Sequence, residues 1–271
     1  MKFDLHLHTY YSDGKYSPKK VVDLSVERNL DGIAITDHDT VLGLEEAIEQ
    51  SKNYKGFMVI PGIEFGCIYM DEEVHILGYF IDYKNKEIIE ATKKLQQSRE
   101  NRGSAIVEKL NNLGFNLTYN NIKELSKENF IGRVPIAKAL VEKGYVSSIK
   151  EAFDKYLDKG KLGYVEKKSL SIKETIDLIK SSGGISVLAH PGLLKKYEII
   201  DYCIKVGIDG IECIHSRHSK EQTEELKELA LKKNLIITGG SDCHGEEING
   251  DLLLGKYYID LESIPEMKER I

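Results

Sequence analysis

Residues 4–14 read DLHLHTYYSDG. Residues two apart along an extended strand point to the same face, so His6 and His8 would lie side by side, with Leu5 and Leu7 on the opposite face. An aspartate and a glycine follow shortly after the strand. Two imidazoles with a carboxylate just beyond them indicate a metal site at the end of this strand.

Strands and helices alternate on both sides of this stretch. Ser17-Pro18 predicts a helix start, because serine suits the position before a helix and proline suits its first turn. Besides the strand at 3–8, we expect strands at 32–37, 58–66, 74–81, 185–189, 210–214 and 235–239, and helices from 17, at 43–53, 171–182, 196–206 and 219–233. Strands that alternate with helices indicate a parallel sheet or barrel.

Residues 86–157 lack clear strand patterns. Helical patterns occupy 88–113, 120–127, 134–143 and 149–157. The sequence therefore predicts an α/β domain made of 1–84 and 169–271, interrupted by a helical insertion domain at 85–168.

The composition is that of an ordinary globular chain, with 271 residues, 41% hydrophobic and 30% charged. The net charge of −6 disfavours long duplex nucleic acid as a partner, so an anionic substrate must be held by local positive charge. No apolar run approaches the roughly 18 residues that span a bilayer, and no secretory signal is evident. The four cysteines form no C-x-x-C pair. We therefore expect reduced thiols, a cytoplasmic location and no membrane association.

Six of the eight histidines lie in or just after the expected strands, and three acidic residues join them. Because the carboxyl ends of parallel strands meet at one rim, these side chains would converge there. A single histidine at a strand end is more often a hydrogen-bonded structural residue, and Asp13-Gly14 alone would indicate a turn. The coincidence of all nine favours metal binding. The candidate ligands are His6, His8, Asp13, His38, Glu64, His75, His190, Asp242 and His244.

The ligand types restrict the metal. Six imidazoles and three carboxylates are too rich in nitrogen for Mg²⁺ or Ca²⁺, and they suit Zn²⁺, Mn²⁺ or Fe²⁺. Nine ligands are too many for one ion and enough for two or three, with Glu64 as the bridging carboxylate. His6 and His8 would then hold one ion from a single strand, and Asp13 would reach a neighbouring ion.

With these residues in view, the sequence resembles the PHP (polymerase and histidinol phosphatase) family. The four motifs of the family correspond to HLHTYYSDG at 6–14, TDHD at 36–39, AHP at 189–191 and SDCHG at 241–245. Glu64 and His75 lie between the second and third motifs, as in the family. The resemblance covers about 1–83 and 170–256. It implies a distorted (β/α)₇ barrel with an inserted helical domain, and a centre of three divalent metal ions.

The resemblance also implies how the ligands are shared. The first ion would be held by His6, His8, Glu64 and Asp242, the second by Glu64, His75 and His190, and the third by Asp13, His38 and His244. Asp13, Glu64, Asp242 and His244 would be the catalytic residues. No ligand position is missing, which argues against a non-catalytic module. Asp37 and Asp39 flank His38 and either orient ligands or serve as ordinary turn residues.

The helical insertion resembles one branch of the family. The segments SRENRGSAIVEKLNNLG (98–114) and IGRVPIAKALVEKG (131–144) are similar to those of nucleoside 3′,5′-bisphosphate phosphatases and 5′→3′ oligonucleotide exonucleases. The implied reaction is hydrolysis of phosphate esters of small nucleotides or short oligonucleotides by a metal-bridging hydroxide. No obligate protein partner is implied. The alternatives are a histidinol-phosphate-type phosphomonoesterase, an amidohydrolase-like C–N hydrolase and a non-catalytic PHP module.

Substrate contacts are predicted from the few positive groups that suit phosphate. Arginine holds phosphate with two parallel hydrogen bonds, and the chain has only six arginines. Arg99 and Arg102 are three residues apart on one helix face, and Arg133 precedes another helix. We expect these three to hold a second substrate phosphate, and His218, in the segment 214–218, to contact phosphate at the barrel rim.

Overall fold

The computed structural model describes residues 1–126 and 131–271. It divides the chain into two compact units. The first is formed by Met1–Thr92 together with Ser169–Ile271, and the second by Lys93–Lys168.

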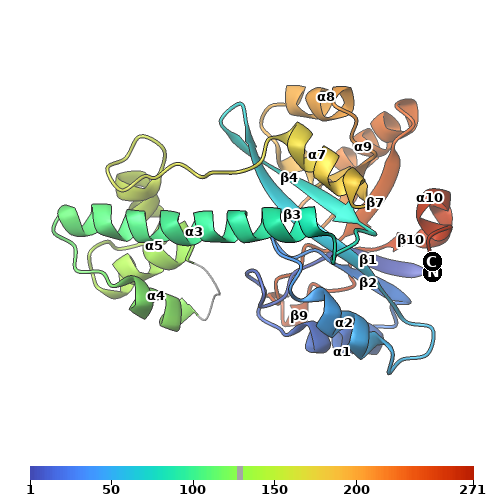
Figure 1. Ribbon diagram of the computed structural model, residues 1–271, viewed down its shortest axis with the longest axis horizontal. Coiled ribbons are helices and arrows are strands. Elements are labelled where there is room, and N and C mark those ends of the chain that lie inside the picture. The colour runs from blue at the N-terminus through green and yellow to red at the C-terminus, as the bar shows by residue number, and fades with distance from the viewer. Residues whose placement is uncertain (127–130) are drawn as a thin grey trace. The chain divides into compact units, whose positions relative to one another are not determined.

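The chain passes from the first unit to the second within one long helix, α3 (Lys86–Asn112), drawn in green in Figure 1. The sequence predicts an insertion from residue 85, whereas the second compact unit begins at Lys93. The difference arises because the first turns of α3 pack on the first unit. Ile88 is fully buried, and the Ser181 hydroxyl donates a hydrogen bond to Glu87 Oε2 at 3.0 Å.

Among the described residues of the first unit, eight strands form one sheet in the order β10-β1-β2-β3-β4-β5-β6-β7. The strands are β1 (Lys2–Leu7), β2 (Gly32–Ile35), β3 (Met58–Tyr69), β4 (Glu72–Tyr79), β5 (Ile185–Leu188), β6 (Gly210–His215), β7 (Ile236–Gly240) and β10 (Ile259–Asp260). The segment after β7 returns to β1, where Leu7 pairs in parallel with Cys243. A Cβ atom on Gly240 would lie 2.4 Å from the His6 Cβ, so only glycine permits this approach. The sheet is thereby nearly closed into a barrel.

Two strands run against the others, the short edge strand β10, which is antiparallel to β1, and β4 within the sheet. β1, β2 and β3 are mutually parallel, as are β5, β6 and β7, but β4 is antiparallel to both of its neighbours. The reason is the connection between β3 and β4, a tight turn in which Met70 and Asp71 have φ of 51° and 66°. A two-residue turn with both φ positive makes a hairpin, which reverses the chain. The distorted barrel expected from the sequence is confirmed, with β4 as its main departure from a parallel sheet.

Helices lie outside the barrel strands in Figure 1. They are α1 (Pro18–Glu27), α2 (Leu44–Ser51), α7 (Ile172–Ser181), α8 (Glu198–Lys205), α9 (Lys220–Lys232) and α10 (Pro265–Lys268), with 3₁₀ turns at Pro191–Leu193 and Leu261–Ser263 and a small hairpin of β8 (Glu247–Ile248) and β9 (Asp251–Leu252). Ser17 caps α1 as predicted, because its hydroxyl accepts a hydrogen bond from the Lys20 N–H at 3.2 Å. The barrel core contains Phe3, Leu5 and Val187, all fully buried.

The second unit has its own hydrophobic core. It contains most of α3 with α4 (Tyr119–Ser126), α5 (Arg133–Glu142), α6 (Ile149–Ala152) and a π-helical turn at Phe153–Leu157. Leu110, Ile136 and Leu140 are fully buried at its centre. These helices match the expected positions, except that residue 127, where the second expected helix ends, lies outside the described residues. In the described part of the chain, no helix is both long and apolar enough to cross a membrane.

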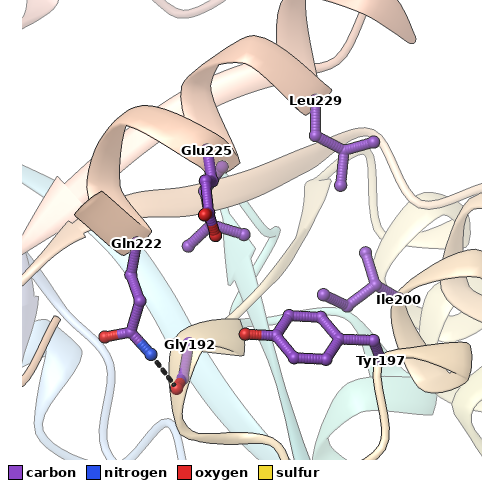
Figure 2. Close-up of a pocket in the computed structure, with 7 residues that line it drawn as sticks. Gly192, Tyr197, Ile200, Gln222, Glu225 and Leu229 are labelled. Atoms are coloured by element: carbon purple, nitrogen blue, oxygen red, sulfur yellow. Dashed lines mark hydrogen bonds between the residues drawn. The ribbon is translucent and has the colours of Figure 1, made fainter. Parts of the chain in front are cut away.

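A small pocket opens between α8 and α9 in the first unit (Figure 2). Tyr197, just before α8, and Ile200, within α8, face it from one side, and Gln222 and Leu229 face it from α9. The Gln222 side-chain amide donates a hydrogen bond to the Gly192 carbonyl at 2.7 Å. This bond ties the loop that follows β5 to the start of α9.

Candidate metal centre

The nine predicted ligands come together at the barrel rim. His6 lies near the end of β1 and His8 directly follows it, His38 follows β2, and Glu64 lies within β3. His75 reaches the same rim from the first half of β4, because that strand runs in the opposite direction. The remaining ligands follow β1, β5 and β7: Asp13, His190, Asp242 and His244.

Glu64 lies at the centre of the cluster, and its side chain is 1% exposed. Its two carboxylate oxygens face five imidazoles. Oε1 lies 2.8 Å from His75 Nδ1 and 3.2 Å from His190 Nε2, and Oε2 lies 3.1 Å from His6 Nε2 and 3.2 Å from both His8 Nε2 and His38 Nδ1. This arrangement suits the bridging role predicted for Glu64.

The first predicted ligand group is compact. The ligand atoms of His6, His8, Glu64 and Asp242 all lie within 4.8 Å of one another. Asp242 Oδ1 is 3.4 Å from His6 Nε2 and 3.2 Å from His8 Nε2. Asp242 has a φ of 55° and donates its backbone N–H to the His6 carbonyl at 2.9 Å. The closure of the barrel between β1 and β7 therefore sets the position of this carboxylate.

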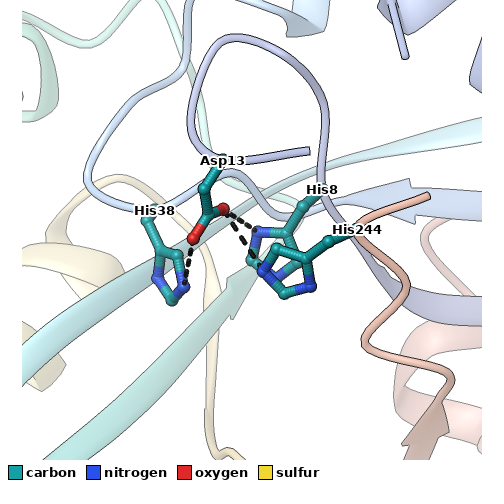
Figure 3. A group of neighbouring side chains, drawn as sticks. All are labelled: His8, Asp13, His38 and His244. Atoms are coloured by element: carbon teal, nitrogen blue, oxygen red, sulfur yellow. Dashed lines mark ion pairs between the residues drawn. The ribbon is translucent and has the colours of Figure 1, made fainter. Parts of the chain in front are cut away.

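The predicted group of Asp13, His38 and His244 is also compact, and it includes His8 (Figure 3). Asp13 Oδ1 lies 3.2 Å from His244 Nε2 and 3.7 Å from His8 Nδ1, and Oδ2 lies 3.8 Å from His38 Nε2. His8 thus presents one ring nitrogen to each of two ligand groups, whereas the sequence predicts it as a ligand of the first group alone. The third compact set is His38, Glu64 and His75. The assignment of His190 to that ion remains a prediction.

The side chains suit divalent ions. Both ring nitrogens of His8, Nδ1 of His38 and Nδ1 of His75 are buried and have no hydrogen-bond partner in the described residues. Carboxylate oxygens nevertheless lie 2.8–3.7 Å from these nitrogens. Buried polar atoms are almost always satisfied, so imidazole nitrogens and carboxylate oxygens that converge in this way call for a shared cation.

The electrostatics of the cluster favour positive charge. Burial alone would lower the pKa of His8, but the carboxylates of Asp242 and Glu64, each 3.2 Å from Nε2, outweigh it and raise the pKa to about 10. Burial is likewise outweighed at His75, where Glu64 raises the pKa to about 9. At His38 burial prevails and lowers the pKa to about 3. Burial would raise the pKa of Glu64, yet the facing imidazoles hold it well below its usual range. Without metal, protons on the imidazoles therefore balance part of the negative charge of the carboxylates, which metal ions would otherwise neutralise.

Asp37 holds the loop that carries Asp13. Its carboxylate accepts hydrogen bonds from the Thr9 N–H at 2.7 Å, the Thr9 hydroxyl at 2.6 Å and the Ser12 hydroxyl at 2.6 Å. Asp39 has a φ of 52° and accepts a backbone N–H of β3 at 3.2 Å. Both residues thus support backbone segments next to ligands.

Sequence reasoning missed one buried acid at the centre. Glu212 lies in β6, is fully buried and faces His6 Nδ1 at 3.0 Å. The signal was present, because an acid stands in the middle of the otherwise apolar strand GIECI, 210–214. An ionised group is rarely buried in a strand unless it is paired.

His218, predicted to contact phosphate at the barrel rim, and its neighbour Arg217 differ in their hydrogen bonds and exposure. His218 uses both ring nitrogens, since Nδ1 donates to the Cys213 carbonyl at 3.0 Å and Nε2 accepts the Gly192 N–H at 3.1 Å. A phosphate contact by His218 remains a prediction, and it would require one of these bonds to break. Arg217, its neighbour, places Nη2 3.3 Å from Asp242 Oδ2 while its side chain is 62% exposed.

The three arginines of the second unit are half-buried. Arg102 Nε donates to the Val165 carbonyl at 2.8 Å. Arg133 begins α5 and lies over the Phe153 ring, 5.4 Å from its centroid. Arg99 lies three residues before Arg102 on α3. Their role in phosphate binding remains a prediction.

The family model described as the PHP domain matches residues 4–184. The chain belongs to the PHP domain family. Over 89% of its length, this PHP protein is 33% identical to the 5′-3′ exoribonuclease Rnm of Escherichia coli, of which it covers 85%. It is 30% identical to the 3′,5′-nucleoside bisphosphate phosphatase of Chromobacterium violaceum, with 89% of this chain and 86% of that one covered. Both names describe the cleavage of phosphate esters.

Its fold is also similar to that of a solved crystal structure. A Bifidobacterium adolescentis protein, assigned as a metal-dependent phosphoesterase, superposes with a TM-score of 0.82 at 32% identity. The match covers 99% of this chain and 94% of that one. The resemblance recognised from the four motifs is thus confirmed at the level of the family and the fold.

Proposed function

We propose that this PHP protein is a metal-dependent phosphoesterase acting on small nucleotides. The substrates are nucleoside 3′,5′-bisphosphates, from which it releases the 3′-phosphate, and short oligonucleotides, which it degrades 5′→3′. The observation that carries the proposal is the convergence of nine ligand side chains at one rim, where ring nitrogens of His8, His38 and His75 face carboxylate oxygens without a hydrogen bond in the described residues. The two relatives named above support the substrate class.

The proposed cofactors are three divalent ions, Mn²⁺, Fe²⁺ or Zn²⁺, held by the nine ligands. Such ions supply a hydroxide nucleophile at neutral pH and offset charge that grows on the phosphoryl oxygens. Glu64 and Asp242, 1% and 10% exposed, lie at the buried bottom of the site. Asp13 and His244 are 37% and 28% exposed, so they border the side from which substrate enters.

Arg217 is the proposed contact to the phosphate that is cleaved. Its guanidinium stands beside the proposed ligand Asp242 and remains largely exposed, so several N–H groups are available to a substrate. A planar guanidinium holds phosphate in a defined orientation. In the second unit, which we propose acts as a substrate cap, Arg99, Arg102 and Arg133 would hold the second phosphate of a bisphosphate or oligonucleotide.

The test is a substrate comparison after loading with Mn²⁺. We expect phosphate release from adenosine 3′,5′-bisphosphate and mononucleotide release from a 3′-labelled RNA trimer, each abolished by chelation. Histidinol phosphate should be a poor substrate, and amides such as dihydroorotate should not react. Faster hydrolysis of histidinol phosphate would favour the phosphomonoesterase alternative, and amide cleavage alone would favour the C–N hydrolase. Full metal loading without turnover of any of these compounds would refute the proposal.

A further inference from the structure

Glu212 uses both of its carboxylate oxygens on two of the proposed ligands. Oε1 lies 3.0 Å from His6 Nδ1, and Oε2 accepts the backbone N–H of His190 at 2.8 Å. The residue lies on β6, whereas His6 belongs to β1 and His190 follows β5. One fully buried carboxylate thus connects two ligands that come from different strands.

The contact with Glu212 decides which nitrogen of His6 carries the proton. An ionised carboxylate only accepts hydrogen bonds, so the proton of a neutral His6 lies on Nδ1 and is donated to Glu212. Nε2 then presents its lone pair to the cluster, 3.1 Å from Glu64 Oε2 and 3.4 Å from Asp242 Oδ1. A metal ion binds an imidazole only through such an unprotonated nitrogen.

The contact with the His190 backbone holds an uncommon conformation. His190 has φ of 30° and ψ of 51°, in the left-handed region that non-glycine residues seldom occupy. Its N–H points to Glu212, while its ring places Nε2 3.2 Å from Glu64 Oε1. Without an acceptor at this point, the part-buried N–H would lose its hydrogen bond, which holds the loop so that the ring faces the cluster.

His6, Glu212 and His215 also form a compact set of ligand types. Their contacts are better explained if Glu212 and His215 orient the metal ligands than if the three residues bind a further metal ion. Both Glu212 oxygens are already engaged. His215 Nδ1 accepts the Arg217 N–H at 3.2 Å, so its Nε2–H can donate to Asp242 Oδ2 at 3.3 Å. His215 therefore hydrogen-bonds one proposed ligand, Asp242, whereas Glu212 hydrogen-bonds two, His6 and His190.

We propose that Glu212 is a positioning residue of the metal centre, which sets the tautomer of His6 and the backbone of His190 so that both rings face the ions. The proposal rests on the proposed function only in requiring that the chain binds divalent metal. It predicts that a neutral residue of the same shape at 212 weakens metal binding while the barrel still folds.

The experiment is Mn²⁺ titration of the metal-free Glu212→Gln variant, with free Mn²⁺ measured by electron paramagnetic resonance. The amide has only one acceptor oxygen, so either His6 must move its proton to Nε2 or the His190 N–H loses its acceptor. We expect binding to weaken about 10- to 100-fold, the usual cost of losing a partner of a metal ligand. The visible spectrum of the Co²⁺-loaded variant should also change, which a loss of stability alone would not cause.

Asp209→Asn is the matched control. Asp209 precedes β6 at its other end, where its carboxylate accepts the Ser186 N–H at 2.9 Å and the Ser186 hydroxyl at 2.7 Å. The substitution changes the same chemical group on the same pair of strands, so it should lower stability without altering Mn²⁺ affinity or the Co²⁺ spectrum.

The outcomes separate this proposal from the proposed function. Wild-type affinity and an unchanged spectrum in Glu212→Gln would overturn the positioning role alone, whereas a wild-type protein that binds no metal would overturn both. If Glu212→Gln does not fold, the tautomer of His6 in the Zn²⁺-loaded wild type is measured by long-range ¹H–¹⁵N correlation. A proton on Nδ1 supports the proposal, and a proton on Nε2 overturns it.

Discussion

Replacing Arg217 with alanine should separate catalysis from stability. The Arg217 guanidinium pairs with Asp242, with 3.3 Å between Nη2 and Oδ2, and the arginine side chain is 62% exposed. Because the guanidinium is exposed and Asp242 keeps its neighbours His6 and His8, the pair contributes about 0.2–1 kcal/mol, as exposed ion pairs do. The free energy of unfolding should therefore fall by less than about 1 kcal/mol, and the variant should remain folded.

The expected loss of activity is much larger. A charge-assisted hydrogen bond to phosphate contributes about 1.5–3 kcal/mol, which corresponds to a loss of roughly 10- to 150-fold in kcat/KM. Every substrate carries the phosphate that is cleaved, so the loss should be similar for adenosine 3′,5′-bisphosphate and for a chromogenic phosphodiester. Arg217→Lys keeps the charge but not the planar geometry, and it should recover only part of the rate.

The assay measures kcat/KM on both substrates with Mn²⁺-loaded protein, together with the bound metal and the free energy of unfolding. Arg28→Ala is the matched control, because Arg28 forms a surface ion pair with Asp251 at 2.6 Å and should leave the kinetics unchanged. Wild-type kcat/KM for Arg217→Ala on both substrates would refute the reasoning. A rate loss that matches a loss of bound Mn²⁺ would show that Arg217 acts through Asp242 and not on phosphate.

The remaining predictions concern the metal, the proton balance, the Asp13 loop and the cap. Asp242→Ala should bind less metal by elemental analysis and lose turnover; wild-type metal content would contradict its role as a ligand. The pKa of His8, raised to about 10, means that Mn²⁺ displaces protons at pH 7–8. Mn²⁺ affinity should therefore rise as the pH is raised toward about 10 and fall at lower pH, and calorimetry in two buffers that shows no proton release would contradict this. Asp37→Ala removes three hydrogen bonds to the loop before Asp13, and it should lower both the melting temperature and the number of bound ions; an unchanged metal count would leave Asp37 a purely structural residue. Alanine variants in the cap should lose roughly 10- to 150-fold on the bisphosphate and far less on a chromogenic monoester, and equal losses on both would argue against a second phosphate site; these variants are Arg99→Ala, Arg102→Ala and Arg133→Ala.

The ligand set could be predicted because each motif is local. His6 and His8 share a face through the two-residue repeat of a strand, and residues that end neighbouring parallel strands meet at one rim. The start of α1 at Ser17-Pro18 followed from the chemistry of a single turn. These features depend on backbone geometry over a few residues, which the sequence displays directly.

Only the tertiary structure shows the contacts between residues that are far apart in the chain. Glu212 meets His6 across 206 residues of sequence, and no local pattern pairs them. The same is true of Asp37, which could be a turn residue until its three bonds to Thr9 and Ser12 were visible. Which buried acid binds a metal ion and which orients a ligand depends on strand order and register, because only these place one oxygen within about 3 Å of a particular nitrogen.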